Sequence, residues 1–223
     1  MPDIVIHGIA ATAYLVLAWH FWNTRWRNSR APRLRLWESV AIVLPLLLQG
    51  AALYRDIFGA PELRFGFAQA LSVMTFLAVL MCWLEAFFFP IEALYPLVLA
   101  AAALCAPLPA FFAGRVTPDP VSFEFRLHLV AGMLAYSLFT VAMLHAVLIA
   151  RLERGLHGTP GLDGPLGGLP PLLSLERLVF ALIGAAFVVL TATLAFGMIA
   201  PSFLISSGGL LTNETTQRHH RKS

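Results

Sequence analysis

The stretch IVIHGIAATAYLVLAWHFW, residues 4–22, contains no Lys, Arg, Asp or Glu and is followed directly by NTRWRNSRAPRLR, residues 23–35. An apolar run of about 20 residues is long enough to cross a lipid bilayer as a helix. A secretory signal would carry its positive charges before the apolar run, whereas here they come after it. By the positive-inside rule the Arg-rich stretch is cytoplasmic, which places the N-terminus outside and predicts that the first span stays in the membrane.

The composition of the whole chain agrees with a membrane protein. Of the 223 residues, 59% are hydrophobic and only 12% are charged, and the mean hydropathy is +0.78. Ordinary soluble domains have roughly 45–50% apolar and about 25% charged residues, so disorder and a soluble nucleic-acid-binding domain are excluded. The net charge of +3 comes from arginines that flank apolar runs, which indicates orientation in the bilayer and no nucleic-acid partner.

Six apolar runs predict an all-α, polytopic bundle of transmembrane helices, since only helices and closed barrels cross a bilayer. The expected spans are residues 4–22, 37–54, 67–84, 93–113, 125–150 and 175–200. They form one transmembrane domain over 1–200, with a Gly/Pro-rich cytoplasmic loop at 155–173 and a polar tail at 201–223. Six crossings return the chain to the outside, so both termini are expected there.

Motifs of self-contained enzymatic chemistry are missing from the sequence. It contains no phosphate loop, no HExxH zinc helix and no recognisable Ser/His/Asp nucleophile set. Cys82 and Cys105 lie inside apolar runs without a CxxC or CxxCH pattern, so we expect buried thiols. Glu85 and Glu92 bracket the loop after the third span and are expected at the membrane interface. We therefore expect no enzyme and no catalytic residues.

Four histidines lie in or at the ends of spans, where an ionisable group is costly and is a candidate functional residue. His7 and His128 are expected near the outer ends of the first and fifth spans, and His20 and His145 near the inner ends. The four histidines thus form an outer and an inner layer, which are roughly 20 Å apart at a rise of 1.5 Å per residue. Paired imidazoles from facing helices could hold a six-coordinate haem, but the helical angles allow at most one such layer. The alternative for each histidine is an interfacial residue bonded to a headgroup or a carbonyl.

The second half of the chain resembles a known family. The matching features are His128 at the start of the fifth span, AYSLF at 135–139 and LPPLLSLER at 169–177 leading into the sixth span. YRDIFG at 54–59 and LRFGFAQALS at 63–72 fit the same pattern. These stretches resemble the cytochrome c assembly family of bacterial inner-membrane proteins, in its CcsA/HemX-like branch, relative to which the chain is expected to be short at its C-terminus.

The resemblance implies that the protein binds or handles haem at the outer face of the bacterial inner membrane, for cytochrome c maturation. It implies His128 as an axial ligand of haem, and no metal other than the haem iron. His7 is a second candidate only because of its expected place at the same outer layer, since it matches no motif of the family. The expected partners are the lipid bilayer, haem and other cytochrome c maturation proteins.

An alternative function remains open, because the chain lacks the second histidine of the family and the Trp-rich haem-presenting loop of its larger members. It is a non-enzymatic accessory or regulatory membrane subunit, for example of a divalent-cation transporter, that does not use haem.

Overall fold

The computed structural model describes residues 2–26, 34–59, 63–89, 92–116, 122–156 and 172–220. Its side chains are described over 4–26, 34–59, 63–89, 93–116, 122–150 and 175–198, and at 153 and 173. Most of the cytoplasmic loop expected at 155–173, the side chains of the tail and the side chain of Glu92 therefore lie outside the described part.

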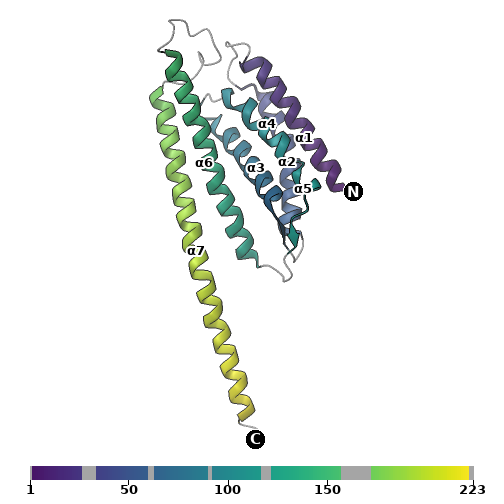
Figure 1. The fold of residues 1–223 in the computed structure, drawn as a ribbon, viewed down its shortest axis with the longest axis vertical. Coiled ribbons are helices and arrows are strands. Elements are labelled where there is room, and N and C mark those ends of the chain that lie inside the picture. Colours follow the sequence, from purple (N-terminus) through teal and green to yellow (C-terminus); the bar gives the residue numbers. More distant parts are fainter. Residues whose placement is uncertain are drawn as a thin grey trace.

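The protein is an all-α bundle of helices, most of which have the length and apolar composition of membrane spans (Figure 1). Five helices are long and apolar enough to cross a bilayer, and they contain the expected first, second, third, fifth and sixth spans. Their bounds are α1 Pro2–Phe21, α2 Leu36–Phe58, α3 Phe67–Glu85, α6 Phe123–Leu156 and α7 Leu172–His220. A π-helical segment, η1 Trp22–Trp26, extends α1 at its end.

The region expected as the fourth span is divided into shorter pieces. A 3-10 turn, η2 Glu92–Leu94, leads into α4 Tyr95–Cys105, and α5 Leu108–Phe111 follows. Proline has no backbone N–H, and its ring clashes with the preceding helical turn. Pro107 therefore ends α4, and Pro109 sits in the first turn of α5, where proline is tolerated. With 11 residues, α4 reaches roughly 16 Å, about half of a bilayer core.

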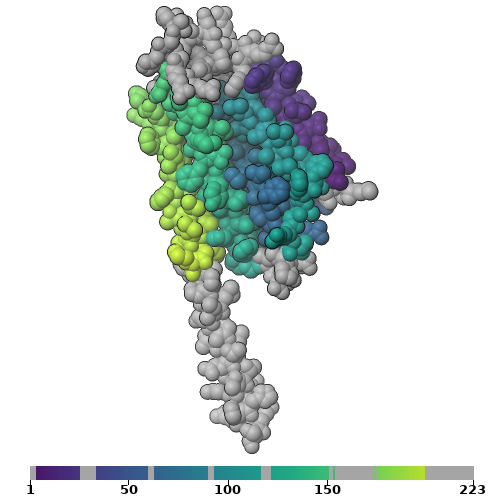
Figure 2. Space-filling model, viewed as in Figure 1, coloured from purple at the N-terminus to yellow at the C-terminus, as the bar shows by residue number. Residues whose placement is uncertain are grey.

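Each helix packs against a defined set of neighbours. α1 packs mainly against α2 and α4, α3 packs against α2, α4 and α6, and α7 packs mainly against α6. As Figures 1 and 2 show, α1 and α7 therefore lie at opposite edges of the bundle. Large apolar side chains of α7, including Phe180, Phe187 and Val188, point away from the protein, as expected of a helix that faces lipid.

The two ends of the bundle differ in their polar contacts. We call the end that carries the start of α1, the end of α2 and the start of α6 the outer end, following the orientation expected from residues 23–35. At this end β1 Arg64–Phe65 pairs antiparallel with β2 Arg115–Val116. Gly114 is required beside this pair, because a Cβ there would lie 2.5 Å from the carbonyl carbon of Phe65. The opposite end is the inner end.

Candidate functional sites at the two ends of the bundle

His128 lies in the second turn of α6, at the outer end, and is half-buried. Its ring rests on the backbone of α7 at Gly197, where an added Cβ would lie 2.8 Å from the His128 Cε1 atom. The ring also stacks on Phe125, with 6.5 Å between the ring centroids. Because Gly197 has no side chain, the histidine ring fills the space that a larger residue would occupy.

The Nδ1 atom of His128 is buried and has no hydrogen-bond partner among the described residues. A buried polar atom without a partner is unusual and calls for an explanation such as a bound group. An axial ligand of haem needs a ring nitrogen that the protein does not engage and that iron can reach. The Nδ1 atom meets only the first condition, because the protein covers it. A haem at this position would therefore have to bind the other ring nitrogen of His128, Nε2, which is not among the buried unpartnered atoms.

His7, the second haem-ligand candidate, is on α1, and only 2% of its surface is exposed. Its Nδ1 atom also has no partner among the described residues. However, α1 packs mainly against α2 and α4, whereas α6 packs mainly against α7 and α3. The first and fifth spans are thus not close packing neighbours, and this arrangement does not favour a His7–His128 pair on one haem. Within the described chain no group of three or more His, Cys, Asp or Glu could hold a metal ion.

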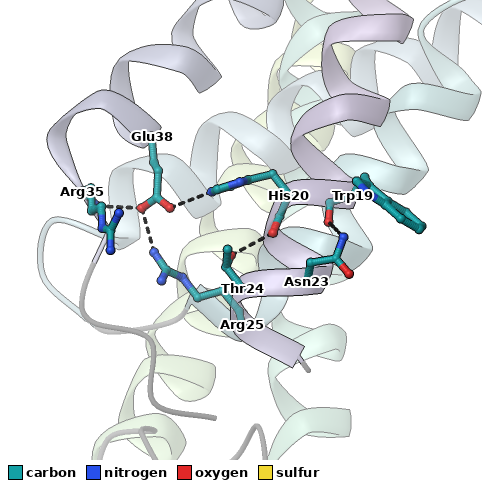
Figure 3. A network of polar contacts seen from close by, with 7 residues as sticks. All are labelled: Trp19, His20, Asn23, Thr24, Arg25, Arg35 and Glu38. Atoms are coloured by element: carbon teal, nitrogen blue, oxygen red, sulfur yellow. Dashed lines mark hydrogen bonds and ion pairs between the residues drawn. The ribbon is translucent and has the colours of Figure 1, made fainter. Parts of the chain in front are cut away.

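At the inner end, a buried polar cluster joins the end of α1 to the start of α2 (Figure 3). Its centre is the carboxylate of Glu38, whose residue is 1% exposed. Arg25 Nη2 donates to Glu38 Oε2 at 2.7 Å, and the Arg35 backbone N–H donates to the same oxygen at 2.8 Å. His20 Nε2 lies 2.9 Å from Glu38 Oε1. Three groups therefore surround the carboxylate, as a buried charge requires.

The π-helical turn η1 helps to place Arg25 in this cluster. π-Helical turns within α-helices are rare and occur often at functional or specially constrained positions. Here η1 carries Arg25 back over the Phe21 ring, with its guanidinium carbon 5.6 Å from the ring centroid, while the head group reaches Glu38. In the sequence, Arg25 indicates only orientation, His20 is a candidate functional residue with an interfacial role as the alternative, and Glu38 is not singled out. The available signal was a lone carboxylate in the first turn of an apolar span beside an Arg-rich loop.

A second buried contact at the inner end joins α3 to α6. His145 is fully buried and Glu85 is 9% exposed, and the Glu85 Oε2 atom lies 3.5 Å from His145 Nε2. Glu85 is thus buried between helices at the end of its span, whereas the sequence indicated only an interfacial position. The cause is packing: α3 lies against α4 and α6, and Glu85 ends α3 on the face that they cover.

Comparisons with known proteins identify no relative of this chain. No family model matches the chain, and neither the curated proteins nor the solved structures include a significant match.

Proposed function

We propose that this multi-pass membrane protein handles haem as its cargo, in the manner of the cytochrome c assembly family. The proposed place of action is the outer face of the bacterial inner membrane, and the proposed axial ligand is His128. The observation that supports this most directly is the half-buried imidazole of His128 at the outer end of the bundle, for which the described residues provide no hydrogen-bond partner. The resemblance of residues 128–177 to that family supports it from the sequence.

In this proposal the protein binds and orients its cargo and performs no chemistry of its own. Haem brings the iron and the macrocycle, while the protein supplies a ligand and a dry environment. The His128 imidazole would hold the iron from one side. Gly197 lets α7 close against the ring, and this contact restricts how the imidazole can rotate. A second ligand from another maturation protein would complete the transfer, since His7 is on a helix that does not pack closely on α6.

The test is the absorption spectrum of protein purified in mild detergent from cells supplied with a haem precursor. The matched variants are His128→Ala and His7→Ala, which remove histidines from the same end of the bundle. We expect a Soret band in the wild type and in His7→Ala, and its loss or shift in His128→Ala. A band that is unchanged in His128→Ala would overturn the role of this residue.

One observation favours the alternative function, an accessory or regulatory membrane subunit that does not use haem. An open apolar groove of about 600 Å³ runs along α1 and α2, between Val5, Gly8 and Thr12 on one side and Ala41 and Leu44 on the other. Transmembrane helices associate through surfaces of small residues such as Gly8 and Ala41. A colourless protein that copurifies with a membrane partner, and loses it when Gly8 is replaced by Leu, would support this alternative.

A further inference from the structure

Glu85 and His145 form a buried pair whose chemistry neither the fold nor the haem proposal explains. Glu85 is the last residue of α3, and His145 lies on α6 at the same inner end. Both carboxylate oxygens of Glu85 and the Nε2 atom of His145 are buried without a hydrogen-bond partner among the described residues. We propose that these two side chains form a proton-binding site, which holds one proton between them near neutral pH.

The argument begins with the tautomer of His145. Its Nδ1 atom lies 2.9 Å from the backbone carbonyl oxygen of Val141, one helical turn earlier. A carbonyl oxygen can only accept a hydrogen bond, so Nδ1 must carry the hydrogen. In a neutral imidazole only one ring nitrogen is protonated, and Nε2 is then an acceptor. The contact with Val141 therefore turns an acceptor nitrogen toward Glu85.

An ionised Glu85 also has only acceptors to offer. Its Oε2 atom and the Nε2 atom of His145 lie 3.5 Å apart, so a carboxylate beside a neutral imidazole would place two lone pairs face to face. One added proton removes this conflict, whether it is carried by the carboxyl group or by the imidazole. In the first case the carboxylic acid donates to Nε2, and in the second the imidazolium donates to the carboxylate.

Among the described side chains, no other positively charged group pairs with Glu85. His145 is the ion-pair partner of Glu85 in the described chain. On α3 the nearest ionisable residue is Cys82, one turn before Glu85, and on α4 the Tyr95 hydroxyl donates to the Cys82 carbonyl oxygen. On α2 the buried carboxylate is Glu38, which is already engaged by Arg25 and His20. A charged carboxylate at position 85 would thus lack the donors that a buried charge needs.

Glu38 and Glu85 are therefore contrasting carboxylates at one end of the same bundle. Glu38 accepts from a guanidinium and a backbone N–H and also contacts His20. Glu85 has no donor among the described residues unless the pair carries a proton. A glutamine at position 85 would offer a permanent donor to His145 Nε2 and would imitate the proton-bound pair. A glutamine at position 38 would instead replace the negative charge beside Arg25 with a neutral amide. The two substitutions thus provide a matched test.

The experiment uses the full-length protein in lipid vesicles near neutral pH. It records infrared spectra for the carboxyl groups and nitrogen NMR spectra of labelled histidine for the imidazoles. Wild type, Glu85→Gln, Glu38→Gln and His145→Gln are measured together, the last to assign the histidine signal. The proposal expects either a carboxylic-acid band that Glu85→Gln removes and Glu38→Gln retains, or an imidazolium signal that His145→Gln and Glu85→Gln both remove and Glu38→Gln retains. An ionised Glu85 beside a neutral His145 would overturn it. A stoichiometric metal ion that Glu85→Gln releases would also overturn it, because the metal would then replace the proton.

Discussion

The imidazole of His128 on α6 lies directly on Gly197 of α7, so closely that an added Cβ would come within 2.8 Å of its Cε1 atom. The contact joins the edge helix α7 to the rest of the bundle and sets the position of the proposed haem ligand. Replacing Gly197 with Ala should push the ring or the helix aside. We expect a loss of about 1–3 kcal/mol in stability, as for other overpacked sites, and a changed haem spectrum.

The control for this substitution is Gly184→Ala on the same helix, where an added Cβ would meet nothing within 4 Å. Alanine is a better helix former than glycine, so this change should not lower stability. Thermal unfolding in detergent compares the two variants. Equal unfolding temperatures would show that the close contact of His128 with Gly197 does not matter.

The Glu38 cluster should be a major contributor to the packing of α1 on α2. Replacing Glu38 with Gln leaves Arg25, which is only 7% exposed, without its counter-charge. Removing one partner of a buried ion pair costs about 3–5 kcal/mol, because the other charge stays buried. The exposed Glu124→Gln serves as the control and should lower stability far less, because this carboxylate is exposed and only supports the first turn of α6. An equally small effect of both changes would indicate that the cluster is hydrated and weak.

In the same unfolding assay, Glu85→Gln should change the stability much less than Glu38→Gln does. An amide at position 85 can donate to His145 Nε2, so the stability should change by less than about 1 kcal/mol. Glu85→Ala should be worse than Glu85→Gln, because it leaves a cavity and an unpartnered imidazole. A large loss in Glu85→Gln would mean that the charge of Glu85, and not a shared proton, supports the fold.

The orientation of the bundle is tested by cysteine labelling in intact cells. In a background without Cys82 and Cys105, Ser29→Cys lies in the Arg-rich stretch after the first span, and Ser122→Cys lies just before α6. A membrane-impermeant maleimide should label position 122 and not position 29, because the arginines hold the first connection in the cytoplasm. The reverse pattern would place His128 at the cytoplasmic face and would contradict the proposed site of haem handling.

Much of the fold could be predicted from the sequence, because the bilayer imposes a simple rule on helix length and polarity. The expected spans at 37–54 and 67–84 fall within α2 and α3 to within a few residues. The region 93–113 was harder to predict. Its apolar content suits a span, but Pro107 and Pro109 divide it into α4 and α5.

The polar sites were less accessible to sequence analysis, because they depend on which helices are neighbours. His20 and His145 belong to no sequence motif. Their carboxylate partners lie on other helices, α2 and α3, and a single sequence does not show which helices are neighbours. The pairing of His7 with His128 would have required α1 to lie against α6. Interactions between helices in a membrane come from close packing of small residues and short polar contacts, which hydropathy does not record.

The measurement that tests the central proposal most directly is a haem titration of the purified wild type beside His128→Ala, followed by its Soret absorption. The account predicts saturable binding in the wild type, with a Soret band that is lost or shifted when the His128 imidazole is removed. Wild type and His128→Ala with the same titration curve, or no binding by either, would contradict the role of His128 as a haem ligand.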